Sequence, residues 1–525
     1  MPRHLRRRLS PLARIIILGV ALVVLMGLVA ALTSSGSSPR AAVPPLPSTF
    51  LAPPKPGPTW TTLENARPGT SSWLLDADGG HPSKNGEIEG YASAVSAQRG
   101  DHISLYVSTT APNWTVSAFR IGWYGGKQGR LVWASPPETG VAQPRPTRDE
   151  RTNMVEATWG PSLSVTIGDD WLPGDYLFKL VSSTHAASWI PLTVRDDISH
   201  SPILINNSVT TWQAYNAWDG YDLYRGPTGS ATRAEVVSFD RPYALGNGSG
   251  DFLGNEQRFV QLVERAGLDV SYTTDVDLHE HPELIRRHRV LVSLGHDEYW
   301  STAMRDGVTA ARDAGVNLVF LGANAVYRHI RLEPSPLGAD RREVNYRVAA
   351  ADPLYHVDDA EVTVQWRDPP VPRPESSLLG EEYECNPVKA DLVVREAGSW
   401  IFAGTGLTAG SRLAGLVGSE YDHWSAVAGG PPVEDVARSP VVCRGRASTS
   451  DLTYYNAPSG AGVIDTGTNL WVPMLMEATR AGVAVDQITL NLLDAAQTGP
   501  LAKIHPAQPA LVTPGTTGPP LPTGD

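Results

Sequence analysis

Four short apolar runs between residues 203 and 321 constrain the fold more than any other feature of this sequence. They are 203–206 (ILIN), 269–273 (DVSYT), 290–294 (VLVSL) and 316–321 (VNLVFL). Continuous β-branched runs suit strands that are buried on both faces. Helical patterns lie between them, as at 256–266, which ends at Gly267. This alternation predicts a doubly wound α/β domain with a parallel sheet over residues 196–500.

Residues 60–195 show a different pattern of apolar and polar residues. Short alternating runs such as 102–108 (HISLYVS), 114–121 (WTVSAFRI) and 176–181 (YLFKLV) are separated by Gly and Pro turns. This is the pattern of a β-sandwich. Over 352–471 the pattern is less regular, with short β-like pieces and Pro-rich loops, which we interpret as an insertion in the α/β domain or a β-rich extension of it. The chain is therefore predicted to be multidomain, with a β-sandwich preceding the α/β domain.

The N-terminus carries the pattern of an export signal. Several arginines, from Arg3 to Arg14, precede an unbroken apolar run at 15–32, and no acidic residue lies before it. The run is at the lower limit for a membrane span and longer than a usual signal-peptide core, so residues 1–33 are predicted to be a retained anchor. A buried core helix is the alternative. The basic flank predicts a cytoplasmic N-terminus and an extracytoplasmic body, or a secreted one if the segment is cleaved.

Two Pro-rich stretches complete this organisation. Residues 34–59 are rich in Ser and Pro and are expected to form a linker, because they cannot bury enough apolar surface to fold. Residues 501–525 have a similar composition and are expected to form a disordered tail.

Charge and cysteine content exclude several classes of function. The formal net charge is −12 and the charges are interspersed, which argues against a nucleic-acid partner. Cys385 and Cys443 are the only cysteines. In an oxidising compartment they predict a structural disulfide, with two unrelated buried thiols as the alternative. No GxSxG, Walker, HExxH or GxGxxG motif occurs in a suitable context, so serine hydrolases, NTPases and dinucleotide enzymes lose their main support.

Polar side chains follow the carboxyl ends of three predicted strands. His296 and Glu298 follow the run 290–294, Asn324 follows 316–321, and Tyr215 follows 203–206. Ligands of α/β domains bind at this edge of the sheet. In an extended backbone His296 and Glu298 share a face, so they can bind a metal or act as a base and acid pair. For Asn324 the alternative is a cap of the following turn.

Aromatic and histidine residues nearby admit simpler interpretations. The loop after the first strand holds Trp212, Tyr215, Trp218, Tyr221 and Tyr224. These side chains either pack together or form a pocket wall. His279 and His281 are a competing metal pair, although their Pro-flanked setting is typical of a solvated loop.

Four motifs resemble the large (beta) subunit of N,N-dimethylformamidase. They are FRIGWYGG at 119–126, TWQAYNAW at 211–218, GHDEYW at 295–300 and YYNAPSGAGV at 454–463. The likeness covers about residues 60–493. It implies an immunoglobulin- or lectin-like β-domain followed by an α/β domain similar to class I glutamine amidotransferases. The usual amidotransferase cysteine has no counterpart here.

The resemblance also implies a metal site. In the family, one mononuclear iron is held by two tyrosines and a glutamate, with a histidine and an asparagine close by. Glu298, His296 and Asn324 match the last three and would be the catalytic residues. Tyr215 in the AYN motif and Tyr176 in the WLPGDY motif match the tyrosines. The tyrosines that could substitute for them are Tyr221, Tyr243 and Tyr272. For Tyr176 the alternative is a tyrosine packed at a corner of the β-sandwich.

The resemblance implies an iron-dependent hydrolase of amide C–N bonds. Phenolate and carboxylate oxygens are hard donors that suit ferric iron. We expect a small or envelope-derived amide as substrate, in a pocket lined by Trp212, Trp218 and Trp300. A homo-oligomer or an added small subunit is compatible with the family. The alternative is a non-catalytic cell-envelope protein that binds carbohydrate by stacking on Trp212 and Trp218.

Overall fold

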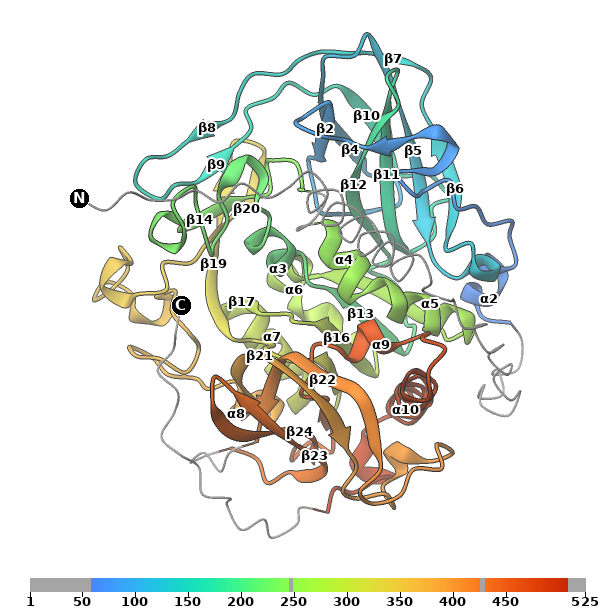
Figure 1. Cartoon of the computed structure of the whole chain (residues 1–525), viewed down its shortest axis with the longest axis vertical. Helices are drawn as coiled ribbons and strands as arrows, with labels where there is room; N and C mark the ends of the chain where they lie inside the picture. The colour runs from blue at the N-terminus through green and yellow to red at the C-terminus, as the bar shows by residue number, and fades with distance from the viewer. Residues whose placement is uncertain (1–57, 245–248, 425–429, 509–525) are drawn as a thin grey trace, which may run out of the picture. The chain divides into compact units, whose positions relative to one another are not determined.

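The four predicted runs form neighbouring strands of one sheet (Figure 1). The computed structural model describes residues 58–244, 249–424 and 430–508. The strands are β13 (Ile203–Asn207), β15 (Val270–Thr274), β16 (Val290–Gly295) and β18 (Asn317–Gly322). They lie parallel in the order β15-β13-β16-β18. Since the chain runs from β13 to β15 on one side and then to β16 on the other, the strand order reverses beside β13.

The same sheet continues into residues that the sequence pattern assigned to an insertion or a β-rich extension. Strand β25 (Gly462–Asp465) pairs with β18 in parallel, and β24 (Arg446–Asn456) and β23 (Glu434–Cys443) add two antiparallel strands. Over the last part of 352–471 the strands therefore extend the main sheet, as one of the two interpretations expected, and do not form an insertion. Short strands of mixed direction carry no periodic signal that separates an added sheet edge from an inserted hairpin.

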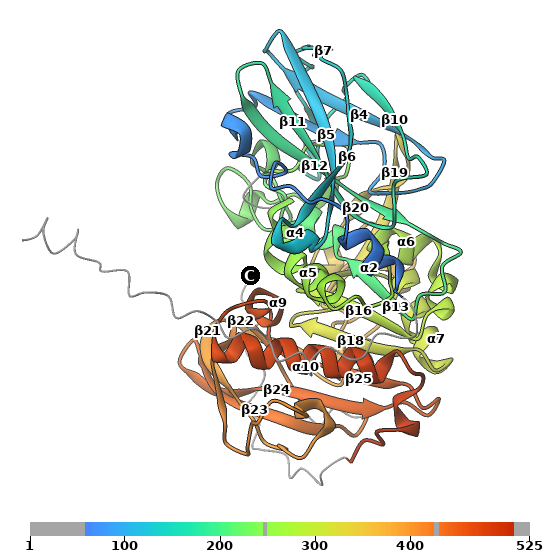
Figure 2. The same cartoon turned by 90° about the vertical axis from the view of Figure 1, so that its right-hand side faces the viewer.

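Helices cover both faces of this sheet because successive strand residues point to opposite sides. Ile203 packs in one core cluster with α5 (Gln257–Arg265) and α10 (Arg480–Ala496). Leu204 packs in another cluster with α7 (Thr302–Asp313). Figure 2 shows α10 lying along the strands. Capping fixes where the helices begin: α7 follows Ser301, whose hydroxyl accepts from the backbone N–H of Met304.

The described residues before 196 form two sheets that share a core, beside a small two-stranded sheet at 147–156. One is 7-stranded, with the path β1-β12-β11-β5-β6, and the other is 3-stranded, β10-β4-β2. Phe178 of the larger sheet and Leu105 of the smaller one belong to the same buried cluster. The strands are β1 (His81–Pro82), β2 (Ile88–Ala92), β3 (Ser96–Gln98), β4 (His102–Thr109), β5 (Asn113–Ile121), β6 (Gly129–Ala134), β7 (Glu138–Thr139), β10 (Leu163–Thr166), β11 (Gly174–Ser182) and β12 (Ala186–Arg195).

Two smaller sheets flank the carboxyl edge of the main sheet. A 4-stranded sheet has the order β14-β20-β19-β17, and β21 pairs with β22 as a two-stranded arm. Their bounds are β14 (Val236–Ser238), β17 (Tyr299–Ser301), β19 (Arg328–Ser335), β20 (Gly338–Val344), β21 (Glu382–Val393) and β22 (Arg412–His423). The remaining elements are α2 (Trp60–Asn65), β8 (Thr147–Arg148), β9 (Val155–Glu156), α3 (Val209–Ala214), α4 (Ser249–Asn255), α6 (Asp275–Glu280), α8 (Ser376–Leu379) and α9 (Trp471–Met474).

A buried ion pair joins the early sheets to the later α/β region. Arg120 of β5 donates to Glu264 of α5 at 2.5 Å, and both side chains are 0% exposed. Tyr272 of β15 donates to the same carboxylate at 2.8 Å. The described residues form one compact unit. Among them, no helix is long and apolar enough to cross a membrane. The apolar run 15–32 lies outside the described residues.

Candidate active site

Two tyrosine hydroxyls meet the carboxylate of Glu298. Tyr215 donates to Oε2 at 2.9 Å, and the Tyr224 hydroxyl lies 2.6 Å from Oε2 and 2.8 Å from Oε1. The two phenol rings are 4.4 Å apart. Glu298 is only 1% exposed. The result is a compact set of oxygen donors at the carboxyl edge of the main sheet, beside the point where the strand order reverses.

Helix α3 brings Tyr215 to Glu298. The helix directly follows β13, and Tyr215 is its C-terminal cap. The backbone N–H of Glu298 donates to the Thr211 hydroxyl at 3.0 Å, and the Thr210 hydroxyl donates to the carbonyl of Tyr299 at 2.8 Å. These bonds hold the helix against the loop that leaves β16, so Tyr215 and Glu298 keep a fixed relation.

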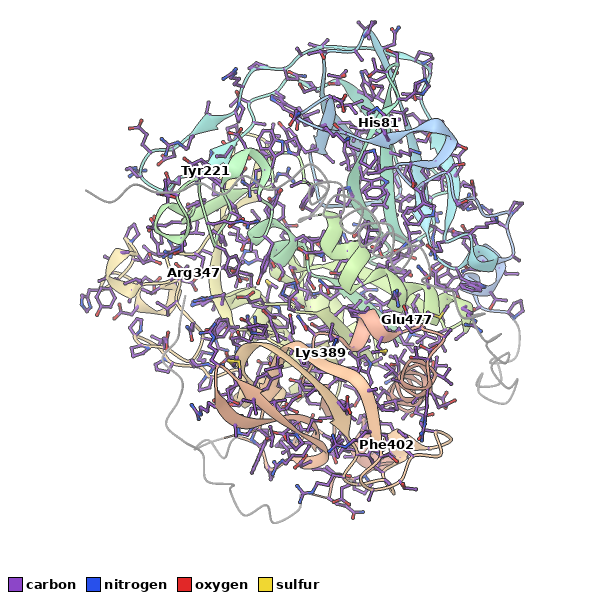
Figure 3. The ribbon with its side chains drawn as sticks, viewed as in Figure 1. His81, Tyr221, Arg347, Lys389, Phe402 and Glu477 are labelled. Atoms are coloured by element: carbon purple, nitrogen blue, oxygen red, sulfur yellow. A yellow bond between two sulfur atoms is a disulfide. The ribbon has the colours of Figure 1, made fainter. Side chains whose placement is uncertain are left out.

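Tyr224 reaches the same carboxylate from the loop after α3. The backbone N–H of Tyr224 donates to Asp222 at 2.8 Å, and that of Leu223 donates to the Ala214 carbonyl at 3.0 Å, so the loop folds back onto the helix. The Arg347 guanidinium lies 4.3 Å from the centre of the Tyr224 ring. Arg347, labelled in Figure 3, comes from the stretch after β20. Tyr224 is thus held by both its backbone and its ring.

A pair of glycines lets the two site-bearing loops approach each other. Gly295 ends β16 and Gly322 ends β18, and the two are register partners. A Cβ on Gly322 would lie 1.5 Å from the carbonyl oxygen of Gly295. Only hydrogen fits there, so any side chain at this position would push the loops that carry His296 and Asn324 apart.

His296 and Asn324 meet a carboxylate that the sequence pattern did not indicate, that of Glu420 on β22. Glu420 Oε2 lies 3.6 Å from His296 Nδ1 and 3.4 Å from Asn324 Nδ2. Asn386 of β21 donates to Glu420 Oε1 at 3.1 Å. The His296 ring is 4.9 Å from that of Tyr215. The β21–β22 arm therefore supplies a second carboxylate and an amide to the group.

Burial and neighbouring charge set the protonation of the group. Burial raises the pKa of the Tyr215 and Tyr224 phenols well above their ordinary values, and the charge of Glu298 adds to the rise. Burial also raises the pKa of Glu298, and Arg328 offsets part of that rise. Burial alone lowers the pKa of His296, but Asp251 and Glu420 hold it well above its ordinary value. Without a bound cation, the phenols therefore stay protonated and donate to Glu298.

A comparison with known proteins identifies the family of this chain. The family described as N,N-dimethylformamidase beta subunit-like, C-terminal, matches residues 115–483. The chain belongs to this family. Two relatives are the N,N-dimethylformamidase beta subunits of Alcaligenes sp and Paracoccus aminophilus, 24% and 25% identical over 141 residues. Each of these alignments covers 26% of this chain and 18% of the relative, so the chain aligns with under a fifth of the length of the relatives it matches.

A solved structure also matches, but weakly. It is an uncharacterized protein from Bacillus anthracis str. Ames, with a TM-score of 0.13 and 8% identity, covering 20% of this chain and 78% of that chain. A likeness this slight carries no argument about fold or function.

The second tyrosine expected from the family motifs lies elsewhere. Tyr176 is on β11, where its ring stacks on Trp171 at 5.0 Å and its hydroxyl donates to the Leu172 carbonyl at 2.8 Å. It belongs to the core shared by the two early sheets and is 1% exposed. The structure brings Tyr224 to Glu298 instead. The three possible substitutes contact other groups. Tyr272 donates to Glu264 at 2.8 Å, Tyr243 lines the small cavity beside Trp212, and the Tyr221 ring lies 5.5 Å from the Arg148 guanidinium.

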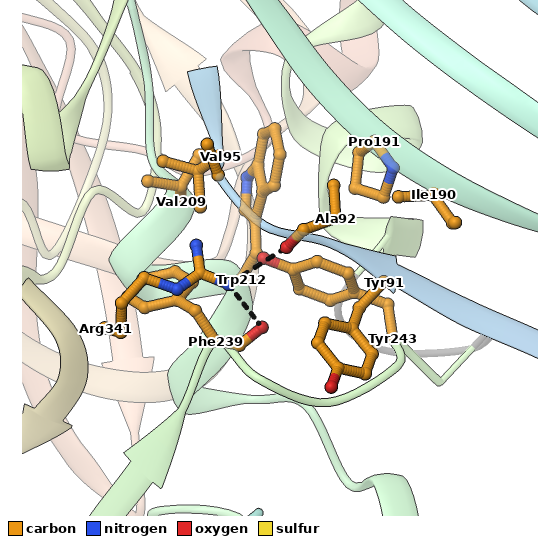
Figure 4. Close-up of a pocket in the computed structure, with 11 residues that line it drawn as sticks. Tyr91, Ala92, Val95, Ile190, Pro191, Val209, Trp212, Phe239, Tyr243 and Arg341 are labelled. Atoms are coloured by element: carbon orange, nitrogen blue, oxygen red, sulfur yellow. Dashed lines mark hydrogen bonds between the residues drawn. The ribbon is translucent and has the colours of Figure 1, made fainter. Parts of the chain in front are cut away.

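None of the three tryptophans expected in the substrate pocket contacts this group. Trp300 donates to Asp297 at 2.8 Å and is 0% exposed, while Trp218 donates to Glu89 at 2.8 Å. Trp212 donates to Glu256 at 2.7 Å and lines a separate cavity of about 10 Å³ (Figure 4). With 4% of its surface exposed, Trp212 has no free face on which a sugar could stack.

The competing histidine pair does not form a metal site. His279 lies 2.8 Å from the Ser301 hydroxyl and 3.6 Å from Asp340, whereas His281 lies 3.8 Å from Glu283. No group of three or more His, Cys, Asp or Glu side chains in the described part of the chain could hold a metal ion. The oxygen atoms of Tyr215, Tyr224 and Glu298 are a different kind of donor set, because two of them come from phenols.

The predicted disulfide is confirmed. Cys385 of β21 is bonded to Cys443 of β23. The bond ties the arm to the edge of the main sheet one residue before Asn386, which contacts Glu420. No cysteine of the described residues is free.

Proposed function

We propose that this chain hydrolyses amide C–N bonds at a ferric ion held by Tyr215, Tyr224 and Glu298. The convergence of two phenol oxygens on one buried carboxylate carries the proposal. Membership of the family supports the reaction class, because the matched relatives are named as dimethylformamidase subunits. We also infer that the α/β region is similar to class I glutamine amidotransferases, after an immunoglobulin- or lectin-like β-sandwich.

The donor chemistry fits a hard, highly charged cation. Three anionic oxygens match ferric iron better than zinc, which favours nitrogen and sulfur ligands. Two polar atoms beside the carboxylate are buried without a hydrogen bond: Asn324 Oδ1, and His296 Nδ1, which is 3.6 Å from its ion-pair partner Glu420. Unsatisfied buried polar atoms are costly in a finished fold, so they are expected to face a bound group.

When bound, ferric iron would supply Lewis acidity, which polarises an amide carbonyl and makes water a better nucleophile near neutral pH. This chain's residues would do the rest. His296, between Glu420 and the Tyr215 ring, would move a proton to the leaving amine. Asn324 has its Nδ2 turned to Glu420 and its Oδ1 free, so it would accept a hydrogen bond from the substrate. A side-chain amide can also donate to a developing oxyanion, but here the Nδ2 donor of Asn324 is turned to Glu420.

We further propose that the reaction takes place on the outer side of a membrane. The arginine-flanked apolar run 15–32 and the Cys385–Cys443 bond both support an exported chain. The substrate would then be a small or envelope-derived amide. A partner subunit is compatible with relatives that are named beta subunits.

Amine release from a panel of small amides tests this function. The iron-loaded full chain is expected to release amine from at least one amide, and both Glu298→Gln and chelation are expected to abolish the release. Glu396→Gln is the matched control, because Glu396 is an exposed glutamate with a side chain 54% accessible. Release that persists in Glu298→Gln would overturn the proposal.

A further inference from the structure

Arg328 is the first residue of β19 and lies against the candidate site. Its backbone N–H donates to the carbonyl of Glu298 at 2.8 Å. Its side chain is 10% exposed, and Nε lies 3.6 Å from Glu298 Oε1. The guanidinium carbon lies 4.6 Å from the centre of the Tyr327 ring. Backbone and ring contacts thus fix the side chain, with its charge directed at the carboxylate group.

The guanidinium of Arg328 has no hydrogen-bond acceptor in the described part of the chain. Its Nε is buried and without a partner. Two other buried arginines have acceptors on several of their nitrogens: Arg120 donates to Glu264, Tyr124 and the Pro173 carbonyl, and Arg341 donates to Asp240 and two backbone carbonyls. Arg305 and Arg347 resemble Arg328 in keeping one buried nitrogen without a hydrogen bond, but among the described residues neither has a carboxylate of the candidate site beside that nitrogen in an ion pair. A guanidinium carries five N–H donors, and leaving the buried Nε donor of Arg328 without an acceptor is costly.

Glu298 does not accept a hydrogen bond from the Arg328 guanidinium. Both of its oxygens already accept from phenols, and 3.6 Å is beyond hydrogen-bond distance. Tyr383 of the β21–β22 arm lies beyond Tyr327, with ring centres 5.0 Å apart. Arg328 therefore offers a charged edge next to two aromatic rings, immediately beside the proposed metal ligands.

We propose that Arg328 binds a carboxylate of the substrate, so that the substrate class is small amides that carry a carboxylate, as N-acyl amino acids do. A planar carboxylate accepts two parallel hydrogen bonds from a guanidinium, and this match is more specific than a point charge. The inference rests on the proposed function, because it places the anion beside the same site. Neutral amides such as dimethylformamide cannot use Arg328 in this way.

Calorimetric binding of two matched ligands tests the inference. N-formylglycine and N-formylglycinamide differ only in carboxylate against neutral amide. The iron-loaded full chain is expected to bind N-formylglycine at least about tenfold more tightly, since a charge-assisted hydrogen bond is worth that much or more. Equal affinities, or no binding of either ligand, would overturn the proposal without any variant being made.

Variants then assign the preference to Arg328. Arg328→Gln is expected to reduce the ratio of affinities to about one, and Arg328→Lys to keep part of it, because the charge remains but the paired donors are lost. Arg373→Gln is the control, since Arg373 is partly exposed and pairs with Asp306. A preference that survives in Arg328→Gln contradicts the inference. If the chain prefers N-formylglycine but releases no amine, the binding role of Arg328 is supported and the proposed hydrolase function is wrong.

Discussion

The hydroxyl of Tyr224 lies 2.6 Å from Oε2 of Glu298, although 74 positions of sequence separate the two residues. This contact defines the candidate site, because Tyr215 donates to the same oxygen. The relation involves only protein atoms and can therefore be tested in the metal-free chain.

Removing the Tyr224 hydroxyl is expected to destabilise the metal-free protein. In Tyr224→Phe the buried Glu298 carboxylate loses a donor, which costs about 2 kcal/mol for a hydrogen bond to a charged group. Tyr176→Phe is the matched control, because its hydroxyl donates to a neutral carbonyl and its loss costs about 1 kcal/mol. Urea denaturation of chelated samples measures both. If Tyr224→Phe loses no more stability than Tyr176→Phe, the result argues against an ionised Glu298.

Gly322→Ala is expected to be among the most damaging small substitutions. The new Cβ would lie 1.5 Å from the Gly295 carbonyl oxygen, so two parallel strands would have to separate. We expect a loss of about 3 kcal/mol or more. Gly160→Ala is the control, since its Cβ would meet nothing within 4 Å. If thermal denaturation gives similar midpoints for both variants, the ends of β16 and β18 are more loosely packed than this close contact requires.

Stability is expected to depend on pH through Asp486 of α10. Burial raises its pKa from the ordinary value to about 6, against the hydrogen bond from the Met476 N–H. The pKa of Asp486 is higher in the folded protein than in the unfolded chain. The contribution of Asp486 to the free energy of unfolding is therefore fully present below about pH 4 and is lost as the pH rises through about 6. Asp486→Asn keeps the acceptor for Met476 and cannot ionise. It should therefore gain up to roughly 3 kcal/mol over the wild type between pH 4 and 8.

The control for that measurement is Asp494→Asn on the same helix, because Asp494 is exposed. Urea midpoints at several pH values should run parallel for Asp494→Asn and the wild type. The assignment fails if Asp486→Asn also runs parallel to the wild type across this range.

Reduction of the Cys385–Cys443 bond is expected to lower stability. The bond closes a loop with a sequence separation of 58 residues, for which chain entropy predicts about 4 kcal/mol. Guanidinium denaturation with and without a reductant measures this loss, and a Cys385→Ser/Cys443→Ser variant should not respond to the reductant. An unchanged midpoint for the reduced wild-type chain would contradict the expectation.

The sequence located the main sheet and part of the site for a simple physical reason. Continuous apolar runs mark buried parallel strands, and the residues after such strands meet at one edge. His296, Glu298 and Asn324 could therefore be placed near one another without a structure. Tyr215 followed because α3 begins directly after β13.

The other members of the site lack such a signal. Tyr224 lies in an aromatic loop without periodicity, where a packing tyrosine and a ligand look alike. Glu420 and Asn386 come from the β21–β22 arm, whose register shifts at several points. Tyr176 was misplaced because a short motif identifies a family position and not the environment of the side chain. Its hydroxyl is already satisfied four residues away, at Leu172.

Iron content and visible absorption of the purified full chain test the proposed ferric site. A ferric ion held by Tyr215, Tyr224 and Glu298 would give about one iron per chain and a visible band from tyrosinate-to-ferric charge transfer. Both should be lost in Tyr224→Phe and in Glu298→Gln and kept in Tyr176→Phe. A colourless wild-type chain that takes up no iron, or iron and colour that survive in Tyr224→Phe but vanish in Tyr176→Phe, would contradict it.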